Sequence, residues 1–224
     1  MNNLILYHST TDFYLSSIRK YGLGGINPNY SLGILDFLKN LYTISETYLS
    51  NNHEYQKLRF STYGMVNQIV KGSFNFKHNK TYLAINESTA IRYSSNEYGS
   101  ELLTRCMFLY KLLIQKGYYD KINTSLLKID INDFIIPKHN KILIKVKNIN
   151  PNDLETETGK NAVEKLKEID LLKTTDIDTY NILSQQFNFA LKVPIDYSEL
   201  EILEISLGRN KENKTIYNLK KYVY

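Results

Sequence analysis

Two short stretches, LYHST at residues 6–10 and YLAINESTAIRY at residues 82–93, decide the fold that this sequence predicts. The apolar run at residues 4–7 is typical of a buried strand and leads directly into one imidazole, His8. Gly22 is placed to end the helix that follows, because glycine adopts the left-handed conformation at helix ends. The side-chain oxygens available to cap the start of that helix are those of Ser9, Thr10, Thr11 and Asp12.

The second stretch has the same strand-then-helix form. Residues 81–84 predict a short strand, and a helix capped by Asn86 or Ser88 then runs to Tyr93. Further helices are predicted at residues 32–49, 63–71 (ended by Gly72), 101–115 (stopped by Gly117) and 162–172. Further strands are predicted at residues 141–146, 187–191 and 200–205, with a loop at 151–159.

Composition indicates an ordinary globular protein. The chain has 224 residues, of which 42% are hydrophobic and 23% charged, with neither repeats nor a Pro-rich or Gly/Ser-rich linker. We therefore expect one α+β domain over residues 1–224, with helices early and strands late. No apolar run reaches the roughly 18 residues of a membrane helix, and the N-terminus does not resemble a signal peptide. Cys106 is the one cysteine, which excludes an internal disulfide and favours the cytoplasm.

No Cys/His spacing indicates a zinc site, so no metal is expected. The net charge of the chain is mildly basic. Lys and Arg number 28 against 23 Asp and Glu, a net charge of +5 that is compatible with a nucleic-acid partner. Candidate basic surface lies at Lys138, Lys141, Lys145, Lys147, Lys211, Lys214, Lys220 and Lys221. Such lysines either hold a phosphate backbone or form a solvated face.

Taken in order, His8, Gly22-Leu23, Tyr82 and Tyr93 resemble the NAD site of the ADP-ribosyltransferases. The resemblance is to the branch of the poly(ADP-ribose) polymerases and diphtheria toxin, and to bacterial toxins of the DarT class. Gly22 follows His8 by 14 positions and Tyr93 follows Tyr82 by 11, the spacings associated with that family. The resemblance implies an ADP-ribosyltransferase-like α+β fold with a central antiparallel split β-sheet and flanking helices.

The same resemblance implies a role for each matched residue. His8 would bind ribose hydroxyls of NAD, and the backbone of Ser9 would bind the nicotinamide amide, with Thr10 beside it. Tyr82 and Tyr93 would stack on the nicotinamide ring. Ala90 stands where the family often has a serine that contacts the carboxamide. The candidates to replace that contact are Ser88, Thr89 and Ser94.

The third catalytic position departs from the family. Placing Val193-Pro194-Ile195 on the family pattern puts Gln186, next to Gln185, where a catalytic glutamate is expected. Glutamine is nearly isosteric with glutamate but cannot act as a general base. Three explanations stay open: a natural variant that transfers without glutamate, an engineered substitution that inactivates a toxic enzyme, or a wrong placement, with Glu199 or Glu201 as the true residue.

The function implied is NAD-dependent mono-ADP-ribosyl transfer by a toxin or phage-defence effector, with release of nicotinamide. NAD is the expected cofactor, the acceptor is a macromolecule with nucleic acid slightly preferred over protein, and an antitoxin or another regulatory partner fits that setting. One alternative is an NAD-dependent RNA 2′-phosphotransferase, for which Arg19, Arg59, Arg92 and Arg105 are the available arginines. The other is a non-catalytic NAD-binding or interaction domain.

Overall fold

The computed structural model describes residues 4–71, 74–210, 212–213 and 215–223. The chain forms two compact units, each assembled from separate segments. Unit 1 contains the chain up to Ile26, then Lys80–Gly99 and the chain from His139 onward, and unit 2 contains Asn27–Asn79 and Ser100–Lys138. The expectation of one domain over residues 1–224 stays a prediction.

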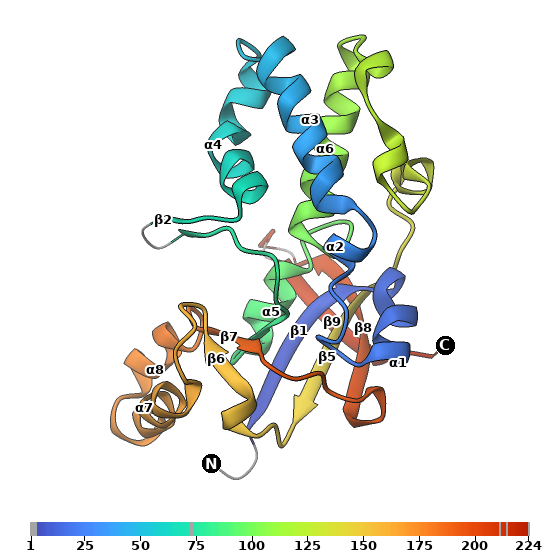
Figure 1. Cartoon of the computed structure of the whole chain (residues 1–224). Coiled ribbons are helices and arrows are strands. Elements are labelled where there is room, and N and C mark those ends of the chain that lie inside the picture. The colour runs from blue at the N-terminus through green and yellow to red at the C-terminus, as the bar shows by residue number, and fades with distance from the viewer. Residues whose placement is uncertain (1–3, 72–73, 211, 214, 224) are drawn as a thin grey trace. The chain divides into compact units, whose positions relative to one another are not determined.

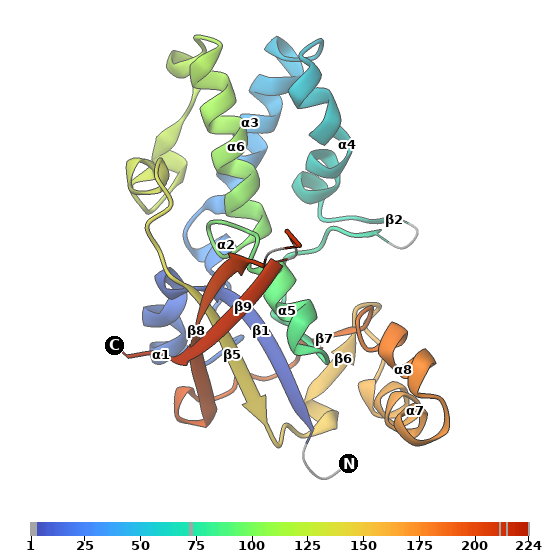
Figure 2. The ribbon, with the colours of Figure 1, turned by 180° about the vertical axis from the view of Figure 1, so that it is seen from behind.

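Unit 1 is built on a seven-stranded antiparallel sheet, seen from its two sides in Figures 1 and 2. Its strands are β1 (Ile5–Thr11), β4 (Tyr82–Ala84), β5 (Lys141–Lys147), β6 (Leu154–Thr156), β7 (Asn188–Leu191), β8 (Leu200–Arg209) and β9 (Thr215–Lys221). Their order across the sheet is β6-β7-β4-β1-β5-β8-β9, so the first strand of the chain lies in the middle. The predicted α+β class, with a central antiparallel sheet and flanking helices, is confirmed.

The two faces of this sheet are covered by different helices. The helices of unit 1 are α1 (Leu15–Tyr21), α5 (Glu87–Tyr93), α7 (Ala162–Thr175) and α8 (Ile177–Leu183), with 3₁₀ turns η1 (Asp12–Tyr14), η5 (Pro151–Asp153) and η6 (Tyr197–Glu199). On one face, Ala84 and Leu143 pack with Ala90 and Ile91 of α5, and we call this the α5 face. On the opposite face, Leu6, Leu83 and Ile144 join the main core with residues of α1 and α7. Side chains that alternate along a strand therefore enter two separate apolar clusters.

Gly22 and Leu23 are held against the late segment that follows β7. The backbone N–H of Leu23 donates to Ile195 O at 2.8 Å, and that of Ile195 donates to Leu23 O at 3.0 Å. Gly22 ends α1 with φ +78° and ψ 162°, a region that is essentially restricted to glycine. A Cβ there would lie 2.6 Å from Ile195 O. The predicted end of the helix at Gly22 is confirmed. Both the backbone conformation and the close contact with Ile195 O require glycine at this position.

Substitution of Gly22 by alanine is therefore expected to destabilise the protein by about 3 kcal/mol, from backbone strain and the contact with Ile195 O together. Gly159 is the matched control, because it also has a positive φ of +83° but nothing lies within 4 Å of a Cβ built on it. Gly159→Ala should cost only about 1 kcal/mol. Urea unfolding of both variants measures the difference, and equal losses would contradict this packing of Gly22.

Unit 2 is mainly helical, with α2 (Pro28–Ser31), α3 (Ile34–Tyr48), α4 (His53–Asn67) and α6 (Glu101–Gln115). It also contains the hairpin strands β2 (Val70–Lys71) and β3 (Phe74–Asn75) and the 3₁₀ turns η2 (Tyr119–Lys121), η3 (Thr124–Leu126) and η4 (Ile131–Phe134). Fully buried side chains of α3 and α6, such as Phe37 and Leu109, form its core. Cys106 is buried here, and burial raises the pKa of its thiol.

Three local predictions are wrong. The side chains at residues 9–12 do not cap a helix, because β1 continues to Thr11 in unbroken pairing with β5. The helix predicted at residues 63–71 is instead α4, which ends at Asn67 and is followed by strand β2, and Gly72 lies outside the described residues. The predicted loop at 151–159 contains strand β6, which pairs with β7. For β1 and β6, pairing with a distant strand outweighs the local signal. For α4, the cap at Asn52 sets an earlier start of the helix.

Candidate functional site

His8 lies on the central strand and reaches across to the next one. Its Nδ1 lies 2.9 Å from the backbone oxygen of Tyr82. A carbonyl oxygen can only accept, so Nδ1 carries the hydrogen and Nε2 is the accepting nitrogen of the neutral ring. Within the described part of the chain, the ring makes no other hydrogen bond. The contact thus fixes both the tautomer and the orientation of the imidazole.

The surroundings of His8 favour the neutral form. Burial lowers the pKa of the imidazole below its ordinary value, and the hydrogen bond to Tyr82 O opposes that shift only in part. At neutral pH the ring is therefore uncharged and can accept a hydrogen bond from a hydroxyl group through Nε2.

The lowered pKa of His8 predicts a loss of stability in acid. In the unfolded chain the imidazole takes up a proton near pH 6.5, whereas in the folded protein it does so only at lower pH. The unfolded state thus binds more protons in this window, so the contribution is complete above about pH 6.5 and is lost as the pH falls toward the folded pKa. Urea unfolding at pH 7.5 and 5.5 should show a larger acid loss in the native protein than in His8→Asn. Equal losses would indicate that the His8 pKa is not lowered.

The imidazole of His8 contacts the main chain of Tyr82, while the two side chains belong to opposite faces of the sheet. Among the described residues, β1 and β4 pair only at Tyr7 and Ala84, both of which belong to the α5 face. Alternation puts Tyr82 and Ser9 on that face and His8 on the other. Where β1 and β4 are no longer paired, the imidazole bond to Tyr82 O joins the two strands.

Tyr93, at the end of α5, is joined to β7 by one hydrogen bond from Asn188, which also donates to Glu157. The Nδ2 of Asn188 donates to Tyr93 Oη at 3.2 Å and to Glu157 Oε1 at 2.9 Å. Tyr93 is 44% exposed. The sequence reasoning missed both Asn188 and Glu157. The available signal was the position of Asn188 at the start of the predicted strand that follows Gln186.

Gln186 is exposed and lies just before β7, where its backbone N–H donates to Leu183 O at 2.9 Å. It lines a cavity of about 840 Å³ together with Glu157, Asn188 and residues of α7. That volume is in the range of ligand pockets, roughly 300–1,000 Å³. His8, Tyr82 and Tyr93 are not among the residues that line it. The structure thus joins Gln186 to Glu157 and Asn188, and does not bring it into a common cavity with His8.

The smaller predicted contact residues are already engaged within unit 1. Ser9 Oγ donates to Ile142 O at 3.3 Å, and Thr10 Oγ1 donates to Gly99 O at 2.9 Å. Ser88 Oγ donates to the Asn86 side chain at 2.7 Å, as part of the cap of α5. Ala90 is buried in the cluster of the α5 face, which explains an apolar residue at a position where serine was expected. Whether any of these contacts NAD stays a prediction.

The alternative carboxylates, Glu199 and Glu201, belong to η6 and β8. Glu201 lies on β8, separated from β4 by β5 and β1, and its Oε2 is 2.6 Å from Lys147 Nζ. Lys147 lowers the pKa of this carboxyl, so Glu201 is the partner of a lysine pair that also includes Lys145 at 4.0 Å. Glu199 belongs to η6, which precedes β8.

Among the lysines proposed for nucleic acid, Lys211 and Lys214 lie outside the described residues.

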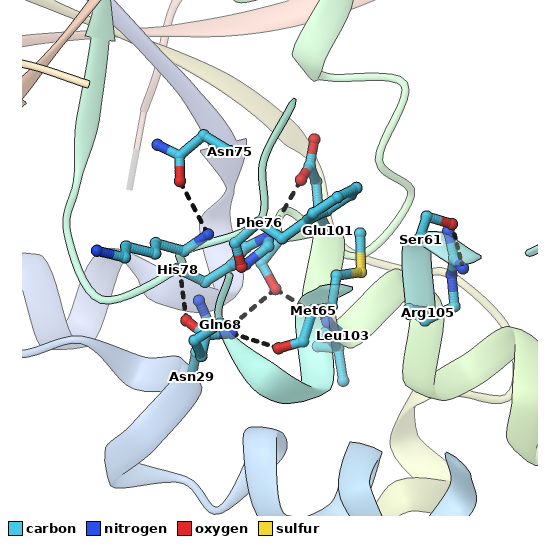
Figure 3. A network of polar contacts seen from close by, with 12 residues as sticks. Asn29, Ser61, Met65, Gln68, Asn75, Phe76, His78, Glu101, Leu103 and Arg105 are labelled. Atoms are coloured by element: carbon cyan, nitrogen blue, oxygen red, sulfur yellow. Dashed lines mark hydrogen bonds and ion pairs between the residues drawn. The ribbon is translucent and has the colours of Figure 1, made fainter. Parts of the chain in front are cut away.

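Two of the four arginines considered for a phosphate are bound elsewhere in unit 2. Arg105 donates to Ser61 Oγ and Leu58 O, each at 3.0 Å, and it is drawn with Ser61 in Figure 3. Arg59 forms a bidentate ion pair with the Glu46 carboxylate. The same close-up shows His78 between Gln68 and Glu101, with Nε2 at 3.1 Å from Glu101 Oε2. These contacts place Arg59, Arg105 and His78 within the internal structure of unit 2.

Neither a family model, nor a curated protein, nor a solved structure matches this chain. Across the described residues, no three His, Cys, Asp or Glu side chains gather as a metal site would require. In the same part of the chain, every helix is too short or too polar to cross a membrane.

Proposed function

We propose that the chain binds NAD and transfers its ADP-ribose to a macromolecular acceptor, with release of nicotinamide. The observation that carries the proposal is the strand order β7-β4-β1. It makes neighbours of three segments that are distant in sequence: the strand of His8, the strand of Tyr82 and the strand that follows Gln186. A chance match of residue spacings would not require these three segments to be adjacent.

The chemistry of these residues suits a nicotinamide ribose. ADP-ribosyl transfer breaks a bond to a leaving group that is already cationic, so it needs positioning and charge stabilisation more than acid catalysis. A neutral imidazole with a fixed tautomer can accept a hydrogen bond from a ribose hydroxyl, and the exposed ring of Tyr93 can stack on nicotinamide. The acceptor is proposed to be nucleic acid in preference to protein.

Incubation with NAD labelled in its adenylate phosphate, in the presence of DNA, RNA or protein, tests this function. Gln186→Glu is assayed beside the native protein. Transfer of label by either form supports the transferase. Binding of NAD without turnover in both forms would instead favour a non-catalytic NAD-binding domain, the second candidate, which the glutamine at position 186 favours. Absence of NAD binding would contradict both.

A further inference from the structure

Glu157 lies in the turn that directly follows β6, and its carboxylate contacts Asn188 of β7. The last pair of β6 with β7 joins Thr156 to Phe189, and beyond it Glu157 Oε1 accepts from Asn188 Nδ2 at 2.9 Å. Asn188 in turn pairs with Ala84 of β4, and Ala84 belongs to the α5 face. Asn188 therefore links the Glu157 carboxylate to the strand β4, which carries Tyr82.

Asn188 holds this carboxylate in a defined orientation. Carboxylates only accept hydrogen bonds, so the amide nitrogen, not the amide oxygen, must face Glu157. With 2.9 Å to Glu157 Oε1 and 3.2 Å to Tyr93 Oη, both amide hydrogens are used. Within the described chain Oε2 of Glu157 has no hydrogen-bond partner. One carboxylate oxygen is thus fixed beside Tyr93 and the other remains to accept a proton.

We propose that Glu157 supplies the carboxylate that the sequence resemblance assigned to position 186, and that Asn188 is its positioning residue. This inference rests on the proposed function. In the reaction, an oxygen or nitrogen of the acceptor forms a bond to C1 of the nicotinamide ribose. The bond from that carbon to the nicotinamide nitrogen breaks, and its electron pair leaves with nicotinamide, which becomes neutral. The proton of the acceptor passes to Glu157.

Glu157 fits this role better than the other groups at the cavity. Gln186 cannot accept a proton at neutral pH. Glu168 of α7 is paired with Lys165, with 2.9 Å between Oε2 and Nζ. Glu164 lines the cavity from the same helix, and no contact links it to Tyr93 in the described residues. The hydrogen bonds of Asn188 connect Glu157 alone to the tyrosine that is expected to stack on nicotinamide.

The test measures NAD affinity by calorimetry and nicotinamide release by chromatography, with water as the acceptor. Glu157→Gln keeps the oxygen that accepts from Asn188 but removes the base. It should slow release by about a hundredfold or more, while the Kd for NAD changes by less than about twofold. Glu164→Gln is the matched control from the same cavity and should match the native protein in both measurements.

The outcomes separate the two proposals. Native-like release by Glu157→Gln overturns the role of Glu157 and leaves the proposed function standing. An equal loss of affinity and rate also overturns it, because Glu157 would then be a binding contact. A native protein that binds NAD without releasing nicotinamide leaves Glu157 no reaction and overturns this inference. A native protein that binds no NAD overturns both proposals.

Asn188→Ala tests the positioning role. Loss of the hydrogen bond to Glu157 should lower kcat about tenfold with little change in KM, because the carboxylate is still present but no longer held. Combining Asn188→Ala with Glu157→Gln should give no further loss than Glu157→Gln alone. Additive losses would show that Asn188 acts independently of Glu157.

Discussion

Replacing His8 by alanine should lower NAD-dependent nicotinamide release by at least about a hundredfold while the sheet remains folded. The substitution removes the accepting Nε2, which the bond from Nδ1 to Tyr82 O holds in place. The structural cost is one hydrogen bond, worth about 1 kcal/mol, together with the packing of a partly buried ring. Activity should therefore fall far more than stability.

The matched control is His53→Ala, which removes an exposed imidazole at the start of α4 in unit 2. It should leave both nicotinamide release and the urea midpoint unchanged. If His8→Ala retains full activity, the imidazole has no role in the reaction. If it unfolds the protein at room temperature, His8 is a structural residue of the central strands.

The second large effect is expected at Tyr93, where alanine and phenylalanine should behave differently. Tyr93→Ala removes the ring and should weaken NAD binding by about ten- to a hundredfold, the range of a lost base-stacking contact. Tyr93→Phe keeps the ring but loses the contact between Oη and Asn188, so affinity should be retained while turnover slows. The 44% exposure of this side chain means that neither change should greatly alter stability.

Calorimetric titration with NAD measures these affinities. Tyr48→Ala serves as a control because Tyr48 is equally exposed, at 44%, but lies on α3 in unit 2. Unchanged affinity in Tyr93→Ala would exclude stacking on this ring. An equal loss in both Tyr93 variants would show that the hydroxyl, and not the ring, carries the interaction.

Local sequence signals were sufficient to predict the strand of Tyr82, the helix of Tyr93 and the helix end at Gly22. The residues that predict a strand at 81–84 and a helix to Tyr93 are found as β4 and α5, with Asn86 as the cap. Gly22 ends α1 as predicted, because its backbone conformation is available only to glycine. In these segments the short-range preference and the tertiary structure agree.

Pairing over long distances was not visible in the sequence. Strand β6 is three residues long and lies in a segment rich in acids and threonine, so only its partner β7 makes it a strand. Glu157 comes directly after β6, and hydrogen bonds of Asn188 link it to Tyr93. A glutamate in the turn after a neighbouring strand cannot be found by aligning one late motif, and that motif indicates Gln186 instead.

The most direct test of the proposed NAD binding is saturation-transfer NMR of NAD in the presence of the native protein. Saturation of the nicotinamide ring protons is expected in the native protein, and its loss is expected in Tyr93→Ala. Saturation confined to the adenine protons, or absent from NAD altogether, would contradict it.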